Sequence, residues 1–323
     1  MGMESKYLWM NGSLVPFEQA TVHFLTPALH YGTAVFEGIR SYRTDRGAAV
    51  FRLGEHAERL AASAKVLGIR EFKYSAEELA EAIKQTVAAN GFEECYIRPL
   101  IYMASGSWNL NVDGGAAGVG IAVWEWTAYL GAEALDRGVR ANVASFTRHH
   151  PNVMMTKAKI SGNYPNSVLA KTESVRLGFD EAIMLDPYGF VAECTGENIF
   201  LVRKGAVITP PTSTVLEGIT RDTAMTIAHD LGYPVFEEQI SRDQLYIADE
   251  VFVSGTAAEV IALREIDFRQ IGSGRMGPIT HSIQKVFQDA IHGHAPQYAH
   301  WLTHATPDCL PDDWPKRVRE MAG

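Results

Sequence analysis

The chain has 323 residues, of which 46% are hydrophobic and 21% charged, and its formal net charge is −9. The length favours two domains, and the composition is that of a globular protein rather than a disordered one. No apolar run approaches the roughly 20 residues of a membrane span, and a net negative chain repels a phosphate backbone, so neither membrane nor nucleic acid is an expected partner. No secretory signal is recognisable, and three scattered cysteines argue against a disulfide framework, so a cytoplasmic location is expected.

Strand-like and helix-like segments alternate in the first 130 residues. Asn11-Gly12 between residues 7–10 and 13–17 predicts a hairpin, because this pair suits a type I′ turn. Helical apolar spacing predicts helices over residues 54–67 and 75–90, the second with a capping box of Ser75 and Glu78. Buried strands are expected at residues 95–103 and 118–126.

A polar segment bracketed by glycines, residues 131–138, is predicted to link a small domain (1–130) to a large one (139–323). In the large domain we expect three strands and three helices, namely strands 181–185, 198–202 and 250–253 and helices 166–177, 222–231 and 279–292. Without a regular βαβ rhythm, the predicted class is α+β in two domains.

Two patterns resemble functional sites and are interpreted otherwise. Residues 272–277 match the Gly-x-Gly-x-x-Gly dinucleotide fingerprint, but the polar approach and Pro278 fit poorly, so a glycine-rich surface turn is preferred. His300 and His304 stand at helical spacing without a carboxylate or thiolate in register, so no metal site is predicted.

Four segments carry chemistry, although each alone has an ordinary structural explanation. Lys157 and Lys159 lie in an otherwise uncharged stretch, where a partly dry lysine can attack a carbonyl. Residues 217–222 combine Gly218 with the start of a helix, which is typical of an anion site, and small residues after a strand at 254–259 allow close backbone approach. Glu193 lies between apolar residues, where a buried acid needs a cationic partner.

Together, a nucleophilic lysine, an anion site and a buried acid are what pyridoxal 5′-phosphate requires. The chain also resembles the fold-type IV aminotransferases, most closely the branched-chain amino acid aminotransferases. The resemblance runs from about residue 7 to 301 and is carried by six motifs in order, at residues 31–40, 96–100, 159–164, 193–200, 218–222 and 254–259. It implies the two-domain fold-type IV architecture.

The resemblance also implies roles for residues around the cofactor. Lys159 matches the lysine that forms the Schiff base, whereas Lys157 stands two residues early. Glu193 matches the acid that pairs with the pyridine nitrogen, and Tyr164 the tyrosine bonded to the ring oxygen. The phosphate ligands are matched by Arg59, Ile219, Thr220 and Thr256. Leu216 matches the residue that packs on the cofactor ring.

Further matches concern the substrate. The resemblance implies a pocket for the substrate side chain, lined by Phe36, Gly38, Trp126 and Tyr129. The residues that hold the substrate's α-carboxylate are matched by Tyr96, Thr256 and Ala257. Arg98 matches the arginine that accepts the distal carboxylate of glutamate. Tyr31 and Leu110 match positions that reach in from a partner subunit, which implies a homodimer or a higher homo-oligomer with shared active sites.

The implied activity is ping-pong transamination of leucine, isoleucine and valine with 2-oxoglutarate, giving branched 2-oxo acids and L-glutamate. An R-selective amine transaminase or a D-amino-acid transaminase on the same fold is an alternative, although the trio of Tyr96, Ile97 and Arg98 favours the L-branched-chain interpretation. A nicotinamide-dependent oxidoreductase that uses residues 272–277 is the alternative from another class.

Overall fold

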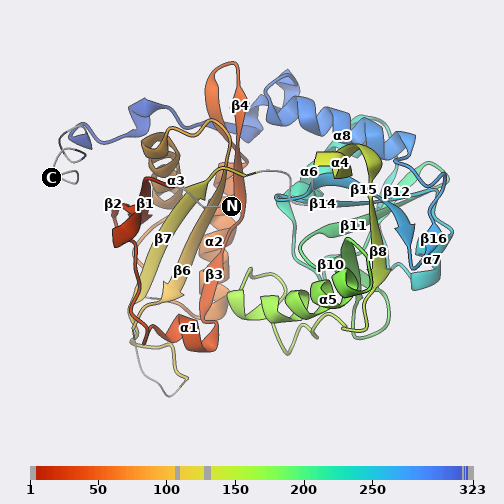
Figure 1. Ribbon diagram of the computed structural model, residues 1–323, viewed down its shortest axis with the longest axis horizontal. Helices are drawn as coiled ribbons and strands as arrows, with labels where there is room; N and C mark the ends of the chain where they lie inside the picture. The colour runs from red at the N-terminus through yellow and green to blue at the C-terminus, as the bar shows by residue number, and fades with distance from the viewer. Residues whose placement is uncertain are drawn as a thin grey trace. The chain divides into compact units, whose positions relative to one another are not determined.

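The computed structural model describes residues 5–70, 72–105, 110–126 and 132–314, together with Lys316 and Val318. The chain forms two compact units, each a mixture of helices and sheet, which confirms the α+β class (Figure 1). The first comprises Met1–Trp126, Ala158–Gly162 and Ala290–Gly323, and the second Thr127–Lys157 and Asn163–Asp289. None of the described helices is both long and apolar enough to cross a membrane.

This division differs from the predicted sequential domains in two segments. Residues Ala158–Gly162 belong to the first unit because Ile160 forms an antiparallel bridge with Val35. The end of the chain belongs there too, since strand β17 (Leu302–His304) pairs with strand β5 (Gly47–Phe51). An interdomain linker at residues 131–138 stays a prediction, and helix α4 (Ala132–Arg137) occupies most of that segment.

The first unit is built on a sheet in the order β17-β5-β4-β6-β7-β1-β2, with β3 beside β6. Its further strands are β1 (Tyr7–Met10), β2 (Ser13–Pro16), β3 (Ala34–Phe36), β4 (Ile39–Thr44), β6 (Cys95–Met103) and β7 (Ala117–Trp124). Its α-helices are α1 (Pro27–Tyr31), α2 (Leu53–Leu67) and α3 (Ala76–Asn90), and its 3-10 turns η1 (Phe17–Gln19), η3 (Pro296–Trp301) and η4 (Pro307–Cys309).

Local sequence signals account for several of these elements. Asn11 and Gly12 both take positive φ, at 50° and 105°, so the β1–β2 turn has the backbone that the pair predicts. Ser75 and Glu78 exchange the two hydrogen bonds of a capping box at the start of α3, and Gly91 ends that helix with φ 72°. Helices α2 and α3 contact each other and pack against the sheet, which places their apolar stripes in the core.

The second unit has a sheet in the order β10-β9-β8-β15-β14-β11-β12-β13, with β16 beside β15. Its strands are β8 (Val139–Val143), β9 (Glu181–Leu185), β10 (Val191–Cys194), β11 (Asn198–Arg203), β12 (Ala206–Thr209), β13 (Val235–Glu237), β14 (Glu250–Gly255), β15 (Glu259–Ile266) and β16 (Arg269–Gln270). Its helices besides α4 are α5 (Tyr164–Arg176), α6 (Ile219–Asp230), α7 (Arg242–Tyr246) and α8 (Pro278–Ile291), and the turn η2 (Ser161–Asn163) precedes α5.

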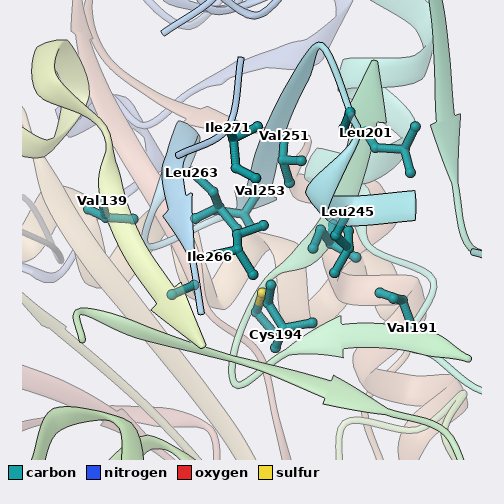
Figure 2. Close-up of a cluster of buried hydrophobic side chains, with 14 of the residues drawn as sticks. Val139, Val191, Cys194, Leu201, Leu245, Val251, Val253, Leu263, Ile266 and Ile271 are labelled. Carbon is teal, nitrogen blue, oxygen red and sulfur yellow. The ribbon is translucent and has the colours of Figure 1, made fainter. Parts of the chain in front are cut away.

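One core of this second unit fixes the strand that carries Glu193. Val191 and Cys194 of β10 point into a cluster with Leu201, Val253 and other side chains from β8, β11, β14 and β15 (Figure 2). Strict alternation would put Val191 and Glu193 on one face, but the pairing with β9 shifts register between these two residues. Because of this irregularity, the side chains of Val191 and Cys194 both belong to the hydrophobic cluster, whereas that of Glu193 does not.

Candidate active site

Lys159 is held through its backbone by two neighbouring elements. Its carbonyl oxygen accepts a hydrogen bond from Phe36 N at 3.0 Å, and its own N–H donates to Ser63 Oγ on α2 at 3.1 Å. The side chain is half-buried, with Nζ 5.2 Å from the centroid of the Phe36 ring. A lysine so placed is positioned beside an apolar surface, as a nucleophilic amine requires.

Lys157 lies in a different environment. Its side chain is 42% exposed and forms an ion pair with Glu217 Oε1 at 2.8 Å. A solvated, paired ammonium is a poor nucleophile, so the structure separates the two lysines that the sequence offers.

Arg59, a predicted phosphate ligand, projects from α2 onto a buried carboxylate. Its Nε and Nη2 donate to Glu37 Oε1 and Oε2 at 2.6 and 2.8 Å, and His56 Nδ1 lies 2.8 Å from Glu37 Oε2. Burial raises the pKa of Glu37, but the Arg59 guanidinium and the hydrogen bonds from His56 and Arg59 outweigh it, and the pKa lies well below its ordinary value. Glu37 is therefore a carboxylate under all physiological conditions.

Five of the residues predicted to contact substrate lie together in the first unit: Phe36, Gly38, Tyr96, Arg98 and Trp126. The Arg98 guanidinium lies over the rings of Phe36 and Tyr96, at 4.6 and 5.2 Å, and its Nη2 donates to Tyr96 Oη at 3.2 Å. The Tyr96 ring is 4.8 Å from that of Trp126. A Cβ on Gly38 would lie 2.0 Å from Tyr96 Oη, so the tyrosine can adopt this position only beside glycine.

Tyr31 and Leu110 lie together along a different cavity of the first unit, which Pro27, Thr33 and Met103 also line. Both are exposed, Tyr31 by 41% and Leu110 by 75%, and Leu110 has a left-handed backbone with φ 66°. Tyr129, the last predicted substrate residue of this part, lies outside the described residues.

In the second unit, Glu193 is buried and bound on both oxygens. Arg148 Nε donates to Oε1 at 2.7 Å, while Leu216 N and Asn198 Nδ2 donate to Oε2 at 3.2 and 3.4 Å. Charge-assisted and amide hydrogen bonds replace the water that a buried carboxylate loses. The predicted buried acid therefore has the cationic partner that its burial demands.

Asn198 connects Glu193 to the predicted phosphate site. It also donates to the carbonyl of Leu216 at 3.0 Å, and its Oδ1 would lie 1.9 Å from a Cβ at Gly218, the N-cap of α6. Ile219 and Thr220 open that helix, which has no side-chain cap, so its amino end favours an anion.

Strand pairing brings the small-residue turn toward the same place. Asn198 lies opposite Ser254 in the β11–β14 ladder, and Thr256 and Ala257 follow at the turn into β15. The Ser254 hydroxyl is buried and has no hydrogen-bond partner among the described residues. A buried donor of this kind is typical of a ligand site.

Tyr164, the remaining predicted cofactor ligand, is half-buried at the first position of α5, within the second unit. Arg148 also reaches this helix, since its Nη1 lies 3.4 Å from both Asn166 Oδ1 and Ser167 Oγ.

The glycine-rich match at residues 272–277 forms a turn in which Gly272 and Gly274 have positive φ. The helix that follows, α8, has its amino end satisfied internally, because Glu250 accepts hydrogen bonds from Ile279 N and Thr280 N at 3.0 and 2.8 Å. A pyrophosphate would meet that carboxylate, so the surface-turn interpretation holds.

Five residues bonded to the predicted site residues or to their partners have no role in the sequence-based interpretation: Glu37, His56, Ser63, Arg148 and Asn198. Glu37 and Asn198 fall inside motifs that carry the resemblance, but nothing local indicates their partners. Arg148 precedes His149-His150, whose imidazoles are the more conspicuous feature of the segment.

The donor sets fit pyridoxal phosphate. The first unit offers a half-buried lysine amine and an oriented guanidinium. The second offers an arginine-paired carboxyl group, a helix start without a side-chain cap and a buried hydroxyl without a partner among the described residues. Cys95 and Cys194 do not compete as nucleophiles, because burial raises the pKa of Cys95 to about 12 and that of Cys194 well above its ordinary value.

Known proteins are similar to this chain in sequence and in fold over almost its whole length. The family described as Amino-transferase class IV matches residues 34–266. The branched-chain-amino-acid aminotransferase of Pseudomonas aeruginosa is 47% identical over 296 residues, 92% of this chain and 96% of that protein.

Two solved structures agree. The T.th. branched-chain amino acid aminotransferase, complexed with N-(5′-phosphopyridoxyl)-L-glutamate, matches with a TM-score of 0.89 and 49% identity, covering 94% of this chain and 100% of that one. The branched-chain amino acid aminotransferase of Escherichia coli matches with a TM-score of 0.91 and 44% identity at the same coverage. These matches confirm the fold-type IV architecture, and the chain belongs to the class IV aminotransferases.

Proposed function

We propose that this chain is a pyridoxal-phosphate-dependent transaminase that moves the amino group of leucine, isoleucine or valine to 2-oxoglutarate, yielding the branched 2-oxo acid and L-glutamate. The observation that carries the proposal is the separation of the two lysines. Lys159 is half-buried beside Phe36 and tied to α2, the helix that presents Arg59, whereas Lys157 is exposed and paired with Glu217.

Pyridoxal phosphate, when bound, supplies an aldehyde that condenses with amines and a ring that accepts the electrons released when a substrate C–H bond breaks. The Lys159 Nζ accepts the α-proton of the amino acid and returns a proton in the reverse half of the cycle. Glu193, oriented by Arg148, would hold a proton on the ring nitrogen. Arg59, Ile219, Thr220 and Thr256 bind the phosphate, Tyr164 binds the ring oxygen, and Leu216 packs on the ring.

Substrate selection falls to the aromatic group of the first unit. Phe36, Gly38 and Trp126 would enclose an apolar side chain, and the resemblance adds Tyr129 to this pocket. Tyr96, Thr256 and Ala257 would hold the α-carboxylate. Arg98 provides a charge for the distal carboxylate of glutamate or 2-oxoglutarate. Its contacts with the rings of Phe36 and Tyr96 keep the guanidinium in place when the substrate is apolar. One site can thereby accept both substrates in turn, as ping-pong kinetics require.

The assembly is a homodimer or a larger homo-oligomer built from it. Exposed apolar side chains support this: Phe24 is 76% exposed, Leu29 61% and Leu110 75%, beside the half-exposed Tyr31. Surfaces of this kind are typical of contacts between subunits, and Tyr31 and Leu110 would then serve the partner's site.

The three cysteines are free thiols, which supports a reducing cytoplasmic location.

A pair of lysine variants tests the proposal. Lys159→Ala should lose the visible absorption band of the bound cofactor and about 10²–10⁴-fold or more of the turnover with leucine, because it removes both the attachment point and the proton carrier. Lys157→Ala is the matched control and should retain both. Turnover by Lys159→Ala at the wild-type rate would refute the assignment.

A further inference from the structure

Helix α2 directs three polar side chains toward the segment that carries Lys159. His56, Arg59 and Ser63 stand at spacings of three and four residues, which places them on one face of the helix. Ser63 holds the Lys159 backbone N–H, and His56 and Arg59 both contact Glu37. The face therefore combines the anchor of the lysine with a buried charge cluster.

Glu37 is the centre of this cluster. Its side chain is fully buried, while that of Arg59 is 14% exposed and that of His56 2% exposed. Its backbone is fixed as well, since Glu37 N donates to the carbonyl of Pro99 on β6 at 3.0 Å. Because both its backbone and its side chain are fixed by hydrogen bonds, Glu37 is a rigid acceptor for the long, flexible side chain of Arg59.

Protonation states follow from the contacts. Burial lowers the pKa of His56, and the charges of Arg59 and Lys159 lower it further against the opposing effect of Glu37, so the imidazole is neutral at neutral pH. A carboxylate can only accept, so the Nδ1 of a neutral His56 carries the proton and donates it to Glu37 Oε2. Glu37 thus receives three hydrogen bonds, two from Arg59 and one from His56.

The contact also orients Arg59. Glu37 receives Nε and Nη2, the side edge of the guanidinium, so the end that bears Nη1 is turned away from the carboxylate. A guanidinium fixed along one edge is planar and rigid, so its position relative to a bound anion is set by Glu37.

We propose that Glu37 and His56 are positioning residues that hold Arg59 in the orientation in which it binds the cofactor phosphate, with His56 fixing the carboxylate and the carboxylate fixing the guanidinium. This inference rests on the proposed function, in which Arg59 is a phosphate ligand. It assigns to the pair an effect on the phosphate group and none on the ring or the aldehyde.

Titration of the apoprotein with pyridoxal phosphate and with pyridoxal, which lacks the phosphate, separates this role from a general structural one. We expect Glu37→Gln and His56→Leu to bind pyridoxal phosphate about tenfold more weakly, the equivalent of about one charge-assisted hydrogen bond. Their affinity for pyridoxal should stay within about twofold of the wild type. His56→Asn, which retains a donor near the position of Nδ1, should recover most of the phosphate-dependent affinity.

Two controls complete the experiment. Glu265→Gln breaks the Arg140–Glu265 pair of the second unit and should change neither affinity. In an Arg59→Ala background, Glu37→Gln should cause no further loss for pyridoxal phosphate, because the residue acts through Arg59.

The possible results are distinct. Equal losses for both ligands would assign Glu37 and His56 to folding alone and overturn the inference, as would unchanged affinity for pyridoxal phosphate. A wild-type protein that binds neither ligand would instead refute the proposed function.

Discussion

Two buried arginine–carboxylate pairs, one in each unit, differ in which member meets the cofactor in our proposal. Arg59 is joined to Glu37 through two guanidinium nitrogens, and the arginine is the proposed ligand. Arg148 is joined to Glu193 through Nε alone at 2.7 Å, and the carboxylate is the proposed ligand. The same ion pair can therefore support either a cationic or an anionic binding group, depending on which member faces the ligand.

The remaining contacts follow this difference. Glu37 is fully buried and its third hydrogen bond comes from His56. Glu193 receives its other bonds from Leu216 N, in the segment leading into α6, and from Asn198 Nδ2, at the start of β11. A carboxylate offers about four acceptor positions, and each acid accepts three hydrogen bonds. In our proposal, the ring nitrogen of the cofactor takes the fourth position of Glu193. Burial without a partner would cost either acid several kcal/mol, which explains why both are paired.

Among changes to the two ion pairs, the largest effect is expected when Glu193, the anionic member of the second pair, is neutralised. Glu193→Gln should lower kcat with leucine about 100-fold, because an uncharged partner no longer stabilises the proton on the ring nitrogen. The affinity for pyridoxal phosphate should change far less than kcat. Steady-state kinetics together with cofactor titration measure both, and a variant with normal kcat would exclude Glu193 from the reaction.

A smaller effect, confined to one substrate class, is expected at Arg98. Arg98→Leu should reduce kcat/KM for glutamate and 2-oxoglutarate by about 10- to 100-fold, the equivalent of one or two charge-assisted hydrogen bonds. The half-reaction with leucine should change only modestly, since its side chain has no charge to bind. Equal losses for both substrate classes would show that Arg98 supports the pocket and does not read the distal carboxylate.

An effect of pH on stability is expected from His149, the neighbour of Arg148 in the chain. Burial and the adjacent Arg148 lower the pKa of His149 from 6.5 to about 4, so between these two pH values the unfolded chain binds more protons than the folded one. Stability should therefore fall as the pH drops through this range, by about 2 kcal/mol at its lower end once solvent screening at the half-buried ring is allowed for. His149→Asn should flatten the fall in urea unfolding experiments, whereas His229→Asn, at a side chain that is 83% exposed, should leave it unchanged.

The smallest effect is expected far from both pairs. Ser75→Ala removes the side-chain half of the capping box at the start of α3 and should cost about 1 kcal/mol of unfolding free energy. Activity at moderate temperature should not change. Urea unfolding and steady-state kinetics measure the two quantities, and a large loss of activity would indicate that α3 influences the site.

Elements governed by neighbouring residues could be predicted from the sequence. The hairpin at Asn11-Gly12, the capped helix after Ser75 and the strand Glu181–Leu185 all lie where local turn, cap and periodicity signals place them. Helices α5 and α6 begin two or three residues before the predicted positions, because Pro165 and Thr220 are accepted in a first helical turn.

The ion pairs could not be predicted in this way. Glu37 meets a partner 22 residues away, and Glu193 one 45 residues away, so no spacing rule connects them. The register shift in β10 that redirects Glu193 depends on the pairing with β9, which periodicity alone does not reveal. The resemblance to fold-type IV enzymes predicts Arg59 and Glu193 as cofactor ligands, whereas their supporting partners are seen only in the folded chain.

The central claim is that this chain is a transaminase specific for branched L-amino acids. The most direct test follows the visible spectrum of the cofactor-loaded protein after mixing with L-leucine, D-alanine or an R-configured arylalkylamine in separate experiments. We predict that L-leucine converts the cofactor to its aminated form within the turnover time and that 2-oxoglutarate reverses the change. Conversion by D-alanine or by the amine, with none by L-leucine, would contradict the account.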